Sequence, residues 1–158
     1  IEGPPVGGDA VINGMVQINN VPWIQINRMT ISGGTYGVTG GLAVGEVRLT
    51  NVTIQNISSI GVFLEDTKAY ISNCTINAPY CIRVARVGVL YVQEVALSAT
   101  SVGISINTAS VAYASNLTGD LGSAPVFEVN AAILFKGSST ITGGADEKSN
   151  GGQIFEDA

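Results

Sequence analysis

Carboxylates are the side chains of this sequence best suited to acid–base chemistry, because histidine, the commonest general base, is absent. Glu65 and Asp66 are adjacent in a predicted turn. Cleavage of a glycosidic bond needs two such groups about 5–10 Å apart. Arg83 and Arg86 follow about one sequence repeat later, so a surface ion pair is the simpler interpretation. Glu65 and Asp66 are therefore candidate catalytic residues, with ion pairing as the open alternative.

The other acidic residues are scattered. Glu94 and Glu128 occur singly and Asp120 lies in a predicted turn, so Glu94 and Asp120 are secondary candidates for an enzymatic groove. Asp146 and Glu147 lie in a polar, glycine-rich segment, but the spacing of a calcium-binding EF-hand is missing. Zinc-ligand spacings and a phosphate-binding loop are also missing. We therefore expect neither a metal site nor a cofactor.

Aromatic residues recur at one outward-facing position of a repeat of about 22 residues. This position is occupied in successive repeats by Gln25, Arg48, Tyr70, Tyr91, Tyr113 and Phe135. We expect these side chains to form a column on the surface. Such a column could be a subunit contact, a stacking platform for saccharide rings, or a product of local packing. Arg48 and the four aromatic residues are accordingly the candidate binding residues.

The repeat itself predicts how these side chains are positioned. Its copies end their first strand in Thr-Ile or a near equivalent, at spacings of 21 to 23 residues. The six anchor positions are Thr30, Thr53, Thr75, Ala96, Thr118 and Thr140. A fixed period in this range is typical of a solenoid, in which each repeat buries its apolar face against its neighbours.

Within each repeat, apolar and polar residues alternate as in half-buried strands. Ile54, Ile76 and Leu97 are inward positions of successive repeats, and second strands are predicted at 60–64, 81–84, 102–106 and 126–129. A polar position that precedes each anchor by two residues is expected to form hydrogen-bond stacks between repeats. It carries Arg28, Asn51, Asn73, Glu94, Asn116 and Ser138. No segment has a sustained helical period, so the fold class is all-β, with parallel strands in successive windings of one coil.

A coil with this period and these aliphatic stacks resembles the right-handed parallel β-helix of pectate lyases and bacteriophage tailspikes. The resemblance covers residues 23–142 and implies about six turns of about 22 residues, capped at both ends. Residues 1–22 are expected to form a cap or an irregular first turn, and residues 143–158 a polar loop and second cap. Pectate lyases use clustered calcium-binding aspartates, whereas no two Asp residues here share a register. The resemblance therefore implies a fold and not an activity.

Composition limits the partners. Hydrophobic residues make up 46% of the chain and charged residues 12%, and the net charge is −5. Basic residues are not clustered, which argues against nucleic acid, and no apolar run approaches the roughly 18 residues that would allow membrane insertion. The apolar excess instead favours a subunit interface. Cys74 and Cys81 could pair in a secreted protein, but a buried, unpaired Cys74 is the simpler interpretation.

Together, the rod-like coil, low charge and resemblance favour a structural and receptor-binding segment of a homotrimeric phage tailspike or tail fibre. Its expected partner is a cell-surface polysaccharide, and its expected location is the virion tail or the cell exterior. One alternative is a polysaccharide lyase or glycoside hydrolase. Another is a bacterial surface or secreted β-helix repeat protein.

Overall fold

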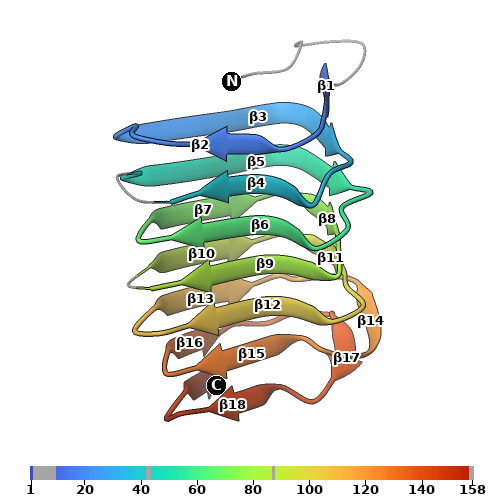
Figure 1. Ribbon diagram of the computed structural model, residues 1–158. Coiled ribbons are helices and arrows are strands. Elements are labelled where there is room, and N and C mark those ends of the chain that lie inside the picture. Colours follow the sequence, from blue (N-terminus) through green and yellow to red (C-terminus); the bar gives the residue numbers. More distant parts are fainter. Residues whose placement is uncertain (2–9, 42–43, 87, 157–158) are drawn as a thin grey trace.

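The chain winds into a parallel β-solenoid (Figure 1). The computed structural model describes residues 1, 10–41, 44–86 and 88–156, and these contain strands but no helix. None of the described segments is therefore a helix that is long and apolar enough to cross a membrane. The expected all-β solenoid is confirmed, with about seven windings in the described residues in place of the expected six. We call each winding a coil.

Three sheets run along the rod. The first contains β1 (Ala10–Asn13), β3 (Trp23–Ser32), β5 (Glu46–Gln55), β7 (Lys68–Ser72), β8 (Thr75–Asn77), β10 (Val89–Gln93), β11 (Ala96–Ser98), β13 (Val111–Ser115), β16 (Ile133–Lys136) and β19 (Gln153–Glu156). The second contains β2 (Val16–Ile18), β4 (Tyr36–Gly40), β6 (Ile60–Glu65), β9 (Tyr80–Ala85), β12 (Val102–Asn107), β15 (Phe127–Asn130) and β18 (Glu147–Ser149). The third pairs β14 (Asp120–Pro125) with β17 (Thr142–Gly144).

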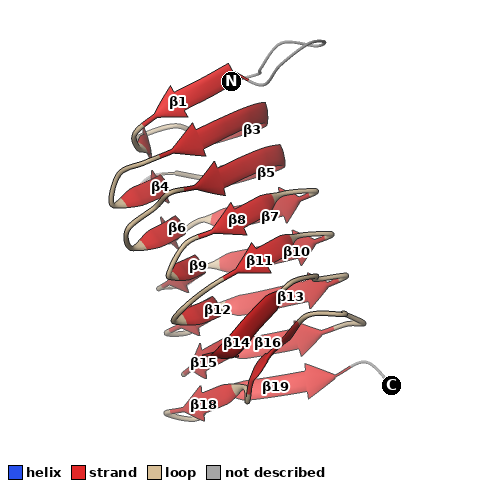
Figure 2. Ribbon diagram, turned by 90° about the vertical axis from the view of Figure 1, so that its right-hand side faces the viewer, coloured by secondary structure: helices blue, strands red, loops and turns tan. Residues whose placement is uncertain are grey.

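Strands of successive coils pair in parallel and in the predicted register. Thr30 pairs with Thr53, Thr53 with Thr75, and Thr75 with Ala96. In Figure 1, β4, β6, β9 and β12 form the near wall and β3, β5, β7 and β10 the wall behind it. Figure 2 shows the side that joins these walls, where β8 and β11 lie. A residue's position in one coil therefore fixes its neighbours in the coils above and below.

At five of the six anchors, the polar residue two positions earlier forms a corner of the coil; Ser138, at the sixth, lacks the left-handed backbone of the other five. Arg28, Asn51, Asn73, Glu94 and Asn116 all have φ between 51° and 56°. One left-handed residue shifts the inward–outward alternation, so the strand changes direction while both halves keep apolar residues inside. Asn tolerates this conformation better than most residues. Corner residues of successive coils were expected to hydrogen-bond to one another. Asn51 instead donates from Nδ2 to Asn27 Oδ1 at 3.3 Å, and Asn27 lies one position before the corner residue Arg28.

The inward side chains form one continuous core. Ile54, Ile76 and Leu97 stack as predicted, with at most 2% of each side chain exposed. A second inward stack consists of Ile26, Leu49, Ile71, Val92 and Ala114, all buried. Stacking like residues at the spacing of the β-ladder removes them from water without helices or a second layer. This core positions the outward residues.

The two terminal segments also belong to the coil. Residues 10–18 provide β1 and β2, which pair in parallel with β3 and β4. At the other end β18 pairs with β15, and β19 pairs with β16. Of the expected terminal caps, residues 2–9 and 157–158 lie outside the described residues.

A charged residue ends one inward stack. Lys136 pairs in register with Ala114, and its Nζ lies 3.0 Å from Asp146 Oδ2 and 3.5 Å from Glu156 Oε1. Burial alone lowers the pKa of Lys136, but the two carboxylates together raise it above its usual value. Asp146 Oδ1 also accepts a hydrogen bond from the Phe127 amide. The ion pair thus closes the apolar interior toward the last coil.

Candidate functional site

The predicted surface column exists and is longer than predicted. Register pairs join Arg48 to Tyr70 and then join the aromatic residues of each following coil. The aromatic column, as we call it, consists of Tyr70, Tyr91, Tyr113, Phe135 and Phe155. Phe155 was not predicted, because the polar stretch 143–152 breaks the spacing that revealed the other four.

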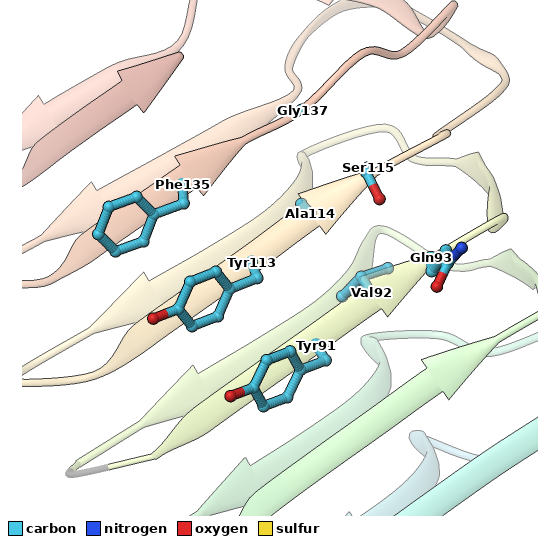
Figure 3. A pocket seen from close by; sticks show the side chains of 8 residues that line it. All are labelled: Tyr91, Val92, Gln93, Tyr113, Ala114, Ser115, Phe135 and Gly137. Atoms are coloured by element: carbon cyan, nitrogen blue, oxygen red, sulfur yellow. The ribbon is translucent and has the colours of Figure 1, made fainter. Parts of the chain in front are cut away.

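The rings stack face to face along the rod. Successive centroids are 4.9, 5.0, 5.0 and 5.4 Å apart, and the interplanar angles are 8°, 7°, 9° and 20°. The β-ladder imposes this spacing, since in-register strands lie about 4.8 Å apart. Figure 3 shows three of the rings, Tyr91, Tyr113 and Phe135, one on each of three neighbouring strands and in similar orientations. The column is thus a direct result of placing one aromatic residue in the same register position of each coil.

Cations cover the first ring of the column. Arg48 Cζ lies 5.1 Å from the Tyr70 ring centroid, and Lys68 Nζ lies 5.0 Å from it. Hydrogen bonding with Tyr70 raises the pKa of Lys68 above its usual value, so this ammonium group stays charged at neutral pH. Arg48 also donates from Nε to Glu46 Oε1 at 2.5 Å. The cationic end of the column is therefore held by contacts within the same sheet.

Stacking determines what the column can bind. Tyr91, Tyr113 and Phe135 each have a ring on both sides, and Tyr70 lies between Tyr91 and the Arg48 guanidinium. A saccharide that stacks on an aromatic residue needs a free ring face, and these four rings offer only their edges. Tyr113 is nevertheless 41% exposed and Phe135 37%. The column is therefore better suited to edge contacts with apolar side chains than to sugar stacking.

Aliphatic residues widen this surface. Val89, Val111 and Ile133 are in register on the same strands, two residues before Tyr91, Tyr113 and Phe135, and are half-buried. The aromatic and aliphatic columns together form what we call the aromatic face. On the other side of the rings lies an open groove of about 280 Å³, with Gln93, Ser115 and Gly137 along it (Figure 3). The face thus combines apolar ridges with one partly polar groove.

The predicted carboxylate pair has structural contacts. Arg86 Nη2 lies 2.6 Å from Glu65 Oε2 across one coil, which confirms the ion pair expected there. The hydrogen bond with Glu65 raises the pKa of Arg86. Asp66 is a corner residue with φ 50° between β6 and β7. Arg83, the other expected cation, is in register with Phe63 and not with Glu65.

The remaining acidic residues are separated and bound to different partners. Glu94 is a corner residue that accepts a hydrogen bond from Gln93. Asp120 Oδ1 accepts hydrogen bonds from the Gly122 amide and the Thr142 hydroxyl, both at 3.0 Å, and these bonds lower the pKa of Asp120. Such contacts are typical of structural carboxylates.

A buried polar contact on the second sheet was not predicted. Ser105 Oγ donates to Glu128 Oε2 at 2.7 Å and accepts from Asn107 Nδ2 at 2.8 Å. Ser105 is fully buried although it occupies an outward register position, between Arg83 and Glu128. This contact could have been predicted by aligning the second strands of successive repeats, because that alignment places residue 105 beside residue 128.

The cysteines are unpaired. Cys74 and Cys81 are buried as free thiols, which confirms the simpler interpretation of Cys74. Burial raises the pKa of each thiol to about 11. Within residues 1, 10–41, 44–86 and 88–156, no three His, Cys, Asp or Glu side chains are grouped so that they could hold a metal ion.

Comparison with known proteins adds no relative from which a site could be transferred. No protein-family model, curated protein or solved structure significantly matches this chain.

Proposed function

We propose that this chain is a structural segment of a fibre in which three copies lie side by side and contact one another through the aromatic face. The observation that carries this proposal is the pairing of the aromatic column with the aliphatic column on a single face of the rod. Contiguous apolar surface of this kind marks protein contacts, and aromatic residues are enriched at interface centres.

The low charge of the chain supports the same role. Only 12% of the residues are charged, although a thin rod has a large surface for its volume. Charged residues are depleted from the centres of protein interfaces, where their desolvation is unfavourable. Contact among three copies would remove the aromatic face from water and leave the charged corners exposed.

A second copy of this chain is a suitable partner for the aromatic face, because its coils have the same spacing. Two rods that run in the same direction have the same rise per coil, so ring edges of one copy can fit the spaces between side chains of the next at every coil. A contact between different surface patches closes into a ring when the rotation is that of a cyclic trimer. A globular partner would match the repeat over only a few coils.

Location and partner complete the proposal. The plain rod and its resemblance to tailspike segments support a place in a virion tail or another extracellular fibre. Its ligand is then a polysaccharide on a cell surface. Because the four predicted rings of the column offer edges, we assign them to assembly, and recognition of the glycan to another part of the rod.

Solution mass tests the assembly role. We expect sedimentation velocity to give three times the chain mass of 16.2 kDa. Tyr91→Ala should shift the chain toward the monomer, whereas Phe63→Ala, which truncates an aromatic residue on the second sheet, should not. A native chain that stays monomeric at high concentration would contradict the proposal.

A further inference from the structure

Trp23 differs from Tyr70, Tyr91, Tyr113 and Phe135, whose ring faces are covered, because its indole ring is open. Trp23, at the start of β3, is 62% exposed and is the single tryptophan of the chain. Its register neighbour in the next coil is Glu46, which is not aromatic. Among the described residues, no ring or cation stacks on the indole and no hydrogen-bond partner is found for its N–H group. Trp23 therefore presents the flat surface that the stacked tyrosines lack.

Polar groups surround this indole. Pro22, Trp23, Gln25, Glu46 and Arg48 line an open groove of about 470 Å³. Gln25 is exposed, and its amide provides a donor and an acceptor. The bond from Arg48 Nε to Glu46 Oε1 fixes the guanidinium and the carboxylate relative to each other. Among the described residues no further hydrogen bond is found for the terminal N–H donors of Arg48 or the second oxygen of Glu46, so these groups can meet a ligand.

From this arrangement we infer that the groove at Trp23 binds a pyranose unit of a polysaccharide. The C–H face of a pyranose packs on an aromatic face, and its hydroxyl groups both donate and accept hydrogen bonds. The groove offers both elements side by side. Glu46 and Arg48 form an ion pair, and Lys68 is the register neighbour of Glu46 in the next coil, so charged groups border the indole on this side. This inference rests on the proposed recognition of a surface glycan and is independent of trimer formation.

Polar surroundings distinguish this site from the aromatic face. The aliphatic residues Val89 and Val111 flank Tyr91 and Tyr113 in the later coils, whereas Glu46 and Lys68 occupy the same register in the earlier ones. An apolar partner would have to desolvate the Arg48–Glu46 pair without replacing its hydrogen bonds, which is unfavourable. A hydroxyl-rich ligand can replace them.

Intrinsic fluorescence tests the inference directly, because emission excited near 295 nm comes from Trp23 alone. The native chain is titrated with dextran, mannan, galactan, and purified O-antigen and capsular polysaccharides. We expect at least one of them to shift the emission and to protect Trp23 from acrylamide quenching. Gln25→Ala should weaken that binding several-fold. Gln17→Ala, an exposed glutamine on β2 of the second sheet, is the matched control and should leave binding unchanged.

Trp23→Ala removes the reporter, so its binding is measured by calorimetry. We expect a loss of affinity of about tenfold or more, with the sedimentation mass unchanged. Glycan binding that leaves the emission of Trp23 unaltered, or that survives Trp23→Ala, overturns the inference but leaves the proposed glycan recognition standing. Absence of binding to every polysaccharide overturns both. A change of mass in Trp23→Ala makes Trp23 an assembly contact and also overturns the inference.

Discussion

Tyr91 and Tyr113 lie one coil apart with their ring centroids separated by 5.0 Å and their planes only 7° from parallel. Each ring covers one face of the other, and their outer faces are covered by Tyr70 and Phe135. Repetition of one register position thus converts single aromatic residues into a continuous ridge. The ridge contributes to the stability of each copy before any partner binds, which leads to the first prediction.

Tyr113→Leu should lower the free energy of unfolding by about 1–3 kcal/mol, because it breaks two stacked pairs worth roughly 0.5–1.5 kcal/mol each. Urea denaturation followed by circular dichroism at low protein concentration measures this loss apart from assembly. Tyr80→Leu is the matched control. Tyr80 is half-buried between the apolar register neighbours Ile60 and Val102 and lies outside the column. Equal losses in both variants would show that stacking adds nothing beyond burial.

Glu94→Asn should stabilise the chain. Glu94 has φ 56°, which is unfavourable for a side chain of this kind, while Asn occupies the equivalent corner at positions 51, 73 and 116. We expect the free energy of unfolding, measured by urea denaturation, to rise by about 0.5–1 kcal/mol. Glu94→Gln removes the charge but keeps the shape, so it separates backbone strain from electrostatics. A gain in the Gln variant equal to that in the Asn variant would contradict the strain explanation.

These corners explain why the fold could be predicted from the sequence while parts of the surface could not. A polar residue two positions before the anchor marks a corner in five coils, at positions 28, 51, 73, 94 and 116, so the register of Tyr70, Tyr91, Tyr113 and Phe135 follows from counting. Counting does not give ring orientation. The face-to-face geometry that blocks sugar stacking comes from the 4.9–5.4 Å spacing of the rings in space.

Residues outside the regular count were missed for a related reason. Phe155 follows a polar segment whose length differs from the other repeats, and Ser105 meets Glu128 only through the pairing of second strands. Trp23 lies two positions before Gln25, where the later repeats carry the non-aromatic residues Glu46, Lys68, Val89, Val111 and Ile133. Its significance comes from exposure, which depends on the surrounding side chains.

Ile76→Ala should be strongly destabilising. Ile76 is fully buried and lies between the inward residues of two neighbouring coils, Ile54 and Leu97. A rigid stack cannot collapse into the cavity, so the expected cost is about 2–5 kcal/mol, against roughly 0.5–1.5 kcal/mol for Ile76→Val. Chemical denaturation of both variants measures the difference. Similar small losses would indicate that the coils can close over the missing side chain.

Replacing Glu65 and Asp66 by Gln and Asn should leave glycan binding intact. Both residues have structural contacts, Glu65 with Arg86 and Asp66 at a corner. The ion pair is exposed to solvent, which screens it, so stability should change little. We also expect the native chain to release no reducing ends from O-antigen or capsular saccharide. Release by the native chain, lost in the double variant, would establish the enzymatic alternative.

The buried thiols predict how stability changes with alkaline pH. Burial raises the pKa of Cys74 and Cys81 to about 11, above the ordinary value of 9.0, so the folded chain favours the protonated thiols. The stabilisation that comes from keeping these thiols protonated is complete below pH 9. It is lost as the pH rises from about 9 to about 11, because the thiols of the unfolded chain lose their protons at lower pH than those of the folded chain. Between pH 8 and 10.5 the loss should be roughly 2 kcal/mol for each thiol. Unfolding free energies of the native chain and of the Cys74→Ala, Cys81→Ala double variant, measured under reducing conditions, isolate this term because every other titrating group is common to both. Parallel pH curves for the two proteins would show that the thiols ionise as readily in the fold as in the unfolded chain.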